Sequence, residues 1–90
     1  MTSRSLIRSA DFFVEDLQDE TLLYRTGSQT AIYLNETAAL VWKLCDGTRS
    51  LKDIVELLIE NFPDAKGSLP QDVEETVAML LEKGALVVEE

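Results

Sequence analysis

The residues that could do chemistry in this 90-residue chain are seventeen carboxylates and a single thiol, because histidine is absent. Histidine is the commonest general base near neutral pH and the commonest metal ligand. One cysteine, Cys45, cannot build the usual thiolate metal site. There is no Ser-His or Cys-His pair and no phosphate-binding glycine loop, since the glycines stand alone. The sequence therefore predicts a protein that is not an enzyme and that binds neither a cofactor nor a metal.

Three features in the middle of the chain offer alternative roles. Cys45 is either a reactive thiol or a small apolar core residue, and its place on an apolar helical stripe favours the core. Trp42 is either a stacking surface for a ligand or a core residue whose indole N–H reaches a backbone acceptor, and the core is the commoner place for a lone Trp. Asp46-Gly47 is either a binding turn or the end of a helix, and the glycine favours the helix end.

Composition and charge describe one acidic, folded domain. Hydrophobic residues make up 46% of the chain, and the net charge is −9, with most of the acidic excess after Cys45. A chain of this length builds one core, so we expect a single domain over residues 1–90. Residues 1–10 are expected to be a loose lead-in, although Leu6 and Ile7 are apolar enough to reach the core. The acidic field repels phosphate backbones and disfavours nucleic-acid binding.

The sequence also predicts where the protein works. Its first residues lack the apolar stretch and cleavage site of a signal peptide, and Cys45 has no partner for an intramolecular disulfide. No apolar run approaches the roughly eighteen residues expected of a membrane-spanning helix. We therefore expect a soluble, cytoplasmic protein.

Aromatic and β-branched residues predict three strands in the first half of the chain. The predicted strands are Phe12–Glu15, Thr21–Arg25 and Thr30–Leu34. Tight turns join them, so they should form an antiparallel meander. Alternation places Ile32 and Leu34 on one face of the third strand and Ala31 and Tyr33 on the other.

The second half of the chain predicts three helices. Asn35 is a strong N-cap for a first helix over Glu36–Cys45, and Gly47 would end it. Its apolar stripe is predicted to be Leu40, Val41, Leu44 and Cys45. Ser50 and Asp53 form a capping-box pattern for a second helix, which Pro63 stops just after Phe62.

Ser68 and Gln71 suggest a reciprocal cap for the third helix, with Pro70 tolerated in its first turn. Gly84 is predicted to end this helix. Leu86–Glu89 is a β-branched tail suited to an edge strand.

An open strand edge is what this order of elements offers to a partner. The outer strands of a meander carry unpaired backbone groups, and a neighbouring helix creates a groove that can accept a peptide as an extra strand. Met79 lies off the main apolar stripe of the third helix, so it either adapts to a ligand in this groove or fills the core. The acidic residues of the same helix either steer a basic partner or form a solvated face.

Four stretches of the chain resemble the PqqD family. They are Leu34-Asn-Glu-Thr-Ala-Ala-Leu-Val-Trp-Lys-Leu-Cys-Asp-Gly47, Ser50-Leu-Lys-Asp-Ile-Val55, Asp72-Val73 and Leu80-Leu-Glu-Lys-Gly-Ala-Leu86. The first stretch, a strand end, a capped small-residue helix and an aspartate-glycine turn, is fairly specific in combination. The match covers roughly residues 12 to 88.

The resemblance implies an α+β, winged-helix-like domain of a three-stranded antiparallel sheet followed by three helices. Proteins of this family are recognition elements for ribosomally made, post-translationally modified peptides. They act as non-catalytic peptide chaperones: each binds the leader of a precursor peptide and presents the core to a modifying enzyme, often a radical S-adenosylmethionine (SAM) protein. Neither the peptide nor the pathway is identified, and pyrroloquinoline quinone synthesis is one pathway among many.

The resemblance also implies where the leader would bind. It would add as a strand to the third strand, in the groove against the third helix. By position, the peptide-binding residues would be Gln29, Thr30, Ala31, Ile32, Tyr33, Asp72, Glu75, Thr76, Met79, Leu80 and Lys83.

Two other classes of function remain open from the residues themselves. A winged-helix DNA-binding regulator has the same order of elements, but the net charge of −9 argues against it. A structural or dimerisation subunit is the third class, and the sequence does not specify the oligomeric state.

Overall fold

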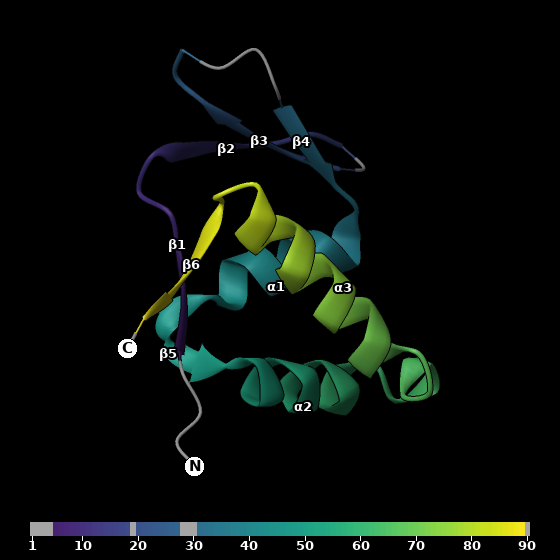
Figure 1. The fold of residues 1–90 in the computed structure, drawn as a ribbon. Helices are drawn as coiled ribbons and strands as arrows, with labels where there is room; N and C mark the ends of the chain where they lie inside the picture. Colours follow the sequence, from purple (N-terminus) through teal and green to yellow (C-terminus); the bar gives the residue numbers. More distant parts are fainter. Residues whose placement is uncertain (1–4, 19, 28–30, 90) are drawn as a thin grey trace.

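The computed structural model describes residues 5–18, 20–27 and 31–89, apart from the side chain of Glu89. Its elements are β1 (Ser5–Arg8), β2 (Phe12–Asp16), β3 (Thr21–Arg25), β4 (Ala31–Leu34), α1 (Glu36–Leu44), β5 (Asp46–Ser50), α2 (Leu51–Asn61), a 3₁₀ turn (Pro63–Ala65), α3 (Leu69–Glu82) and β6 (Leu86–Glu89). The strands form two three-stranded antiparallel sheets, which pack with the helices in an α+β fold, as predicted (Figure 1).

The predicted meander is present as the sheet β2-β3-β4, here called the meander sheet. β3 pairs with β2 on one side and with β4 on the other. The alternation within β4 is the predicted one, because Ile32 and Leu34 are buried whereas Tyr33 is 62% exposed. Figure 1 shows this sheet above α1 and α3. Its inner face therefore covers the core, and β2 and β4 are its two outer strands.

The second sheet, β5-β1-β6, joins the start, the middle and the end of the chain. Ser5–Arg8, expected to belong to a loose lead-in, instead form its central strand β1, and Leu6 is buried. The tail strand predicted at Leu86–Glu89 is confirmed as β6, which pairs along β1. Residues 1–4 lie outside the described residues. Pairing between distant segments cannot be predicted from a strand of four residues, so β1 was not expected.

Gly47 does not end the first helix, contrary to the prediction. The helix α1 ends at Leu44 with Cys45 as its C-cap, and Gly47 lies inside β5 with a φ of 91°. The register between β1 and β5 shifts between Leu6 and Ile7, so the opposing strand carries a bulge at this point. A bulge commonly needs a residue of positive φ, which glycine supplies without strain.

The start of α1 is the predicted one, and its buried face is predicted in part, since Val41 and Cys45 are buried. The side-chain oxygen of Asn35 accepts a hydrogen bond of 2.8 Å from the backbone N–H of Ala38, which confirms the N-cap. Leu40 and Leu44, placed on the predicted stripe, are only partly buried. The buried residues of the helix are Ala38, Ala39, Val41 and Trp42. Ala38, Val41, Trp42 and Cys45 follow the i, i+3, i+4, i+7 spacing of one helix face, and Leu40 and Leu44 lie to one side of it.

Trp42 and Cys45 belong to the core, as predicted. Trp42 is buried, and its Nε1–H donates a 3.3 Å hydrogen bond to the backbone oxygen of Ala85. Cys45 is fully buried, and its thiol contacts the backbone oxygen of Val41. Both residues are buried, and neither lies at the surface for a ligand.

The capping box of α2 is confirmed in both directions. The backbone N–H of Asp53 donates to the Ser50 hydroxyl at 3.2 Å, and the backbone N–H of Ser50 donates to the Asp53 carboxylate at 3.0 Å. The helix ends at Asn61, with Phe62 as its C-cap immediately before Pro63. Proline thus stops the helix where the sequence predicts.

The two ends of α3 differ in how well the sequence predicts them. Ser68 occupies the N-cap position, but its hydroxyl makes no cap and instead donates to the backbone oxygen of Ala65 at 3.3 Å. The predicted Ser68–Gln71 cap is therefore wrong, because the backbone of Ser68 is helical (φ −107°, ψ −21°) and not extended, as a capping residue requires. At the other end Gly84 adopts a φ of 80°, and Ala85 N–H donates to Leu80 O at 2.9 Å. This is the glycine-terminated end that the sequence predicts.

Buried apolar side chains from both sheets and all three helices form one cluster. Its largest fully buried members are Leu23, Leu34, Ile54, Leu80, Leu86, Val41, Val73 and Cys45. Within the described residues, every helix is too short or too polar to cross a bilayer.

Candidate functional site

The strand β4 is the element that could accept a partner's backbone. It pairs with β3 on one side, and no strand within residues 5–18, 20–27 and 31–89 pairs with its other side. Outer strands carry unpaired N–H and C=O groups that can template a further strand. Of the residues proposed here from the sequence, Ala31, Ile32 and Tyr33 lie on β4, whereas Gln29 and Thr30 lie outside the described residues.

The helix α3 supplies the rest of the candidate site, and its members differ in depth. Asp72, Glu75 and Lys83 are exposed, whereas Thr76 and Met79 are partly buried. Leu80 is 0% exposed and lies in the core. The side chain of Leu80 therefore supports the site from beneath and does not line its surface.

A hollow of about 290 Å³ brings the acidic half of α3 next to the end of β4. Its lining residues are Asn35, Thr37, Asp72, Glu75 and Thr76. Three of the sequence-predicted residues thus meet in one place. The hollow, here called the α3 hollow, is rich in hydrogen-bond acceptors and carries two carboxylates beside the end of the outer strand.

Asn35 and Thr37 were not predicted as site residues, although Asn35 was predicted as a cap. They face α3 because the first turn of α1 follows directly on β4. The approach of this turn to α3 is a tertiary contact, and no local pattern in the sequence signals it. The cap thus has two roles, since it starts α1 and also lines the hollow.

The opposite end of α3 carries positive charge. Lys83 is the C-cap of the helix, and its backbone oxygen accepts a 3.5 Å contact from the guanidinium of Arg25 at the end of β3. Arg25 also stacks over the ring of Phe12, with its guanidinium carbon 4.7 Å from the ring centroid. The candidate site is therefore acidic where β4 ends and of mixed charge where α3 ends, since Lys83 and Arg25 lie near the exposed Glu82.

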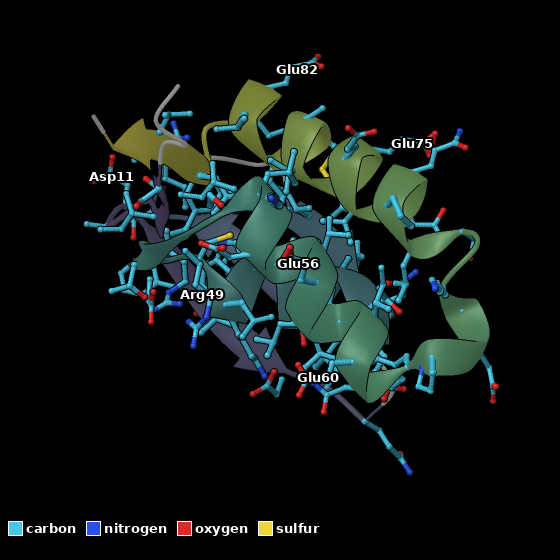
Figure 2. All side chains as sticks on the ribbon, turned by 90° about the horizontal axis from the view of Figure 1, so that it is seen from below. Asp11, Arg49, Glu56, Glu60, Glu75 and Glu82 are labelled. Carbon is cyan, nitrogen blue, oxygen red and sulfur yellow. The ribbon has the colours of Figure 1, made fainter. Side chains whose placement is uncertain are left out.

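The acidic residues lie on the outer sides of the helices. Figure 2 shows Glu75 and Glu82 projecting from α3, and Glu56 and Glu60 from α2. The described helix faces are thus unfavourable for a nucleic-acid backbone.

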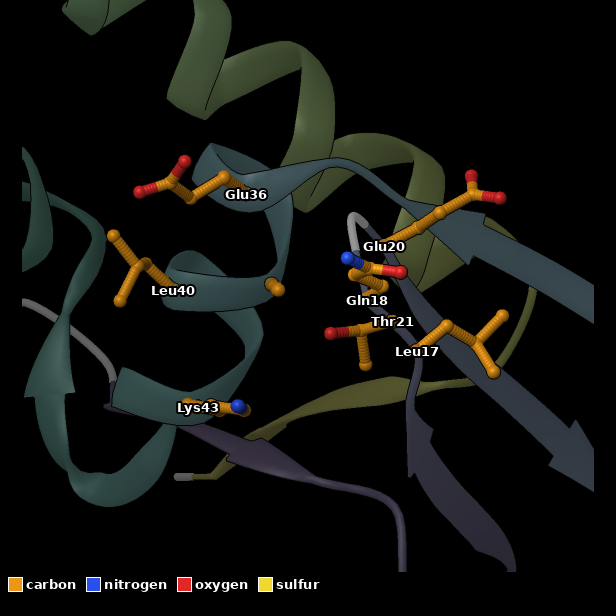
Figure 3. A pocket seen from close by; sticks show the side chains of 8 residues that line it. Leu17, Gln18, Glu20, Thr21, Glu36, Leu40 and Lys43 are labelled. Carbon is orange, nitrogen blue, oxygen red and sulfur yellow. The ribbon is translucent and has the colours of Figure 1, made fainter.

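Two other hollows lie away from the β4 edge. One, of about 260 Å³, lies between α1 and the β2–β3 turn, where Leu40 and Lys43 face Leu17 and Thr21 (Figure 3). The other, of about 280 Å³, lies between α1 and the end of α2 and is mostly apolar. Neither contains a residue predicted for the site, and neither adjoins the free edge of β4.

The titratable groups with shifted pKa values have structural roles. Burial raises the pKa of the Cys45 thiol to about 11, which leaves it protonated at neutral pH. A hydrogen bond from Thr21, together with Lys43, lowers the pKa of Asp16. Hydrogen bonds from Thr48 lower the pKa of Asp46. Among the described residues, no three Cys, Asp or Glu side chains gather as a metal site would require.

These features define a class: a small α+β domain that offers an extended segment a free strand edge beside a helix. Residues 20–86 match the family described as "Coenzyme PQQ synthesis protein D (PqqD)". The chain belongs to this family, which confirms the resemblance seen in its sequence.

Similar proteins support this assignment. A "PqqA binding protein" of Methylococcus capsulatus is 41% identical over 70 residues, which are 78% of this chain and 70% of that protein. A "PqqA binding protein" of Acinetobacter baylyi is 41% identical over 58 residues, or 64% of this chain. The chain spans about half the length of the latter protein, 54% of it.

A solved structure shares the fold. The structure described as "TbiB1 in Complex with the TbiA(beta) Leader Peptide" superposes with a TM-score of 0.73 and covers 89% of this chain and 93% of that chain. The two chains are 18% identical, so the similarity concerns the fold alone.

Proposed function

We propose that this chain is a non-catalytic adaptor that binds the leader of a ribosomally synthesised precursor peptide. The leader adds as a strand to the free edge of β4, and the domain presents the bound precursor to a modifying enzyme such as a radical SAM protein. The observation that carries the proposal is the outer edge of β4, which pairs with no strand of the described residues and lies beside the α3 hollow. Strand addition uses the backbone for affinity and adjoining side-chain pockets for specificity.

The comparisons support the same function. Two relatives are named as PqqA binding proteins, and TbiB1 has been solved with a leader peptide. The residues that would contact the peptide are Ala31, Ile32 and Tyr33 of β4 and Asp72, Glu75, Thr76, Met79 and Lys83 of α3. Gln29 and Thr30, also predicted from the sequence, lie outside the described residues. Leu80 would act by holding α3 in place, since it is fully buried.

Charge separates this proposal from DNA binding. The net charge is −9, and α3, the helix that would have to approach a duplex, has Asp72 in its first turn and no basic residue in its last. Phosphate contacts dominate nucleic-acid affinity and require clustered Lys or Arg.

Calorimetric titration with synthetic PqqA peptides of M. capsulatus and A. baylyi tests the proposal. We expect saturable one-to-one binding that a scrambled peptide of the same composition does not show. If neither peptide binds, and if no peptide selected from a random library binds, the adaptor function is wrong. Light scattering on the free chain then tests whether it is a dimerisation subunit instead.

A further inference from the structure

The outer face of the meander sheet, which points away from the core, carries exposed aromatic rings. Phe13 is 52% exposed, Tyr24 is 39% exposed and Tyr33 is 62% exposed. Phe13 and Tyr24 lie directly opposite each other in the β2–β3 register, and their rings stack with centroids 5.6 Å apart. Exposed apolar clusters of this kind mark interaction surfaces more often than isolated surface residues do.

The outer-face side chains form two rows across the strands, and both rows end at β4. The first row is Phe13, Tyr24 and Ala31, and the second is Glu15, Leu22 and Tyr33. Ala31 and Tyr33 are two positions apart, so they share the outer face of the free strand. Both rows therefore stop at the edge where the proposed peptide strand would begin.

The small side chain of Ala31 leaves space above it at the β4 end of the first row. An added strand would lie about 4.8 Å from β4, and Tyr24 is one strand further away. A long apolar side chain opposite Ala31 can lean across its methyl group and contact the ring of Tyr24, which is already stacked on Phe13. Two positions along the peptide, a second side chain would lie beside the exposed ring of Tyr33.

We propose, resting on the adaptor function above, that the bound peptide is recognised on its outer face as well as in the groove. Its outer face carries two apolar residues two positions apart: a long one that fills the gap over Ala31 and reaches Tyr24, and one that packs against Tyr33. The inner face of the same strand meets Thr76 and Met79 of α3. Ala31 and Tyr33 are thus specificity-determining residues, and an extended peptide with an apolar-any-apolar pattern is the ligand.

The charge of the surface favours this occupant over a charged partner. In the two rows the single ionisable carboxylate is Glu15, on β2, the strand farthest from the free edge. At the edge itself the outer face presents a methyl group and a phenol ring. An apolar side chain of the peptide therefore meets no charged group there.

A volume-exchange experiment tests the proposal. Random twelve-residue peptides displayed on phage are selected against the chain, and the tightest binder is synthesised. We expect the selected sequences to share the apolar-any-apolar pattern. Ala31→Leu should weaken the tightest binder about three- to fivefold, the scale of one cross-strand pair. Shortening the peptide's long apolar residue to alanine should restore much of that loss for the Ala31→Leu variant and should weaken binding to the parent chain.

Matched variants on the same face complete the design. Tyr33→Thr should weaken binding about three- to fivefold, whereas Phe13→Thr, two strands from β4, should change the affinity less than about twofold. Circular dichroism melting checks that each variant folds.

NMR spectra recorded with the peptide report whether the backbone amides of β4 shift on binding. If they shift but the affinity is the same for the parent, Ala31→Leu and Tyr33→Thr, this inference is wrong and the adaptor function stands. If the peptide binds but the amide signals of β4 do not shift, both this inference and the proposed strand addition at β4 are wrong. If Tyr33→Thr changed the oligomeric state in light scattering and left peptide affinity unchanged, the face would bind a second copy and the inference would be wrong.

Discussion

The Nε1–H of Trp42 donates to the backbone oxygen of Ala85, 3.3 Å away, and the backbone N–H of Ser9 donates to the same oxygen at 2.9 Å. One carbonyl thus joins α1, the β1–β2 connection and the link between α3 and β6. This contact ties α1 to the end of α3, the helix that lines the candidate site.

Replacing Trp42 tests this contact. Trp42→Ala should lower the free energy of unfolding by about 3–5 kcal/mol, because it opens a cavity in the core. Trp42→Phe keeps most of the ring and leaves the Ala85 oxygen bonded to Ser9, so it should cost only about 1–2 kcal/mol. Urea denaturation of the three proteins measures both values. A Trp42→Ala variant as stable as the parent would contradict the core role.

The capping box of α2 predicts a pH dependence of stability. A backbone hydrogen bond from Ser50 lowers the pKa of Asp53 below its ordinary value of 3.8 in the folded state. The ionised carboxylate therefore stabilises the fold above about pH 4, and this contribution is lost as the pH falls through the lowered pKa. Asp53→Asn should make the unfolding free energy less sensitive to pH between pH 5 and 2.

A second variant completes that experiment. Ser50→Ala should lower stability by about 1 kcal/mol at neutral pH, since it removes the N-cap. Equal pH profiles for Asp53→Asn and the parent would show that the carboxylate has no role in the cap.

The buried thiol should be unreactive in the folded protein. With the pKa of Cys45 raised to about 11, roughly one thiol in a thousand is ionised at pH 8. A chromogenic disulfide reagent should therefore react far more slowly with the native chain than with the chain unfolded in urea. Equal rates would place Cys45 at the surface and reopen its reading as a functional thiol.

Filling the α3 hollow should block the peptide. Thr76 lines it, so Thr76→Trp should weaken peptide binding at least about tenfold, or about 1.4 kcal/mol. Ala78→Trp places the same ring on an exposed position of α3 outside the hollow and should leave affinity within about twofold. Calorimetry with the peptide used for the parent chain measures both. If both variants bind equally well, the groove beside α3 is not used.

Local signals explain which parts of the fold could be predicted from sequence. The Asn35 cap, the Ser50–Asp53 box and the Gly84 terminus depend on neighbours within a few residues, and all three are confirmed. The strand β1 and the bulge at Gly47 depend on pairing between segments far apart in the chain, so composition did not indicate them.

The candidate site also has features that a local sequence pattern predicts and features that it does not. The alternation that exposes Tyr33 follows from the period of a strand, and the structure confirms it. The contribution of Thr37 to the α3 hollow depends on how α3 packs against α1. That packing is set by side chains from the whole core, which a stretch of sequence does not specify.

Hydrogen exchange on the chain saturated with a PqqA peptide tests the central claim most directly. The described residues hold four outer strands: β4, β2 on the opposite edge of the same sheet, and β5 and β6 in the other sheet. The strands β2 and β6 serve as the comparisons. Strand addition at β4 predicts that alternate amides of Ala31–Leu34 become protected, while Phe12–Asp16 and Leu86–Glu89 exchange as before. Saturable binding that protects β2 or β6 instead, or that protects no strand edge, would contradict the account.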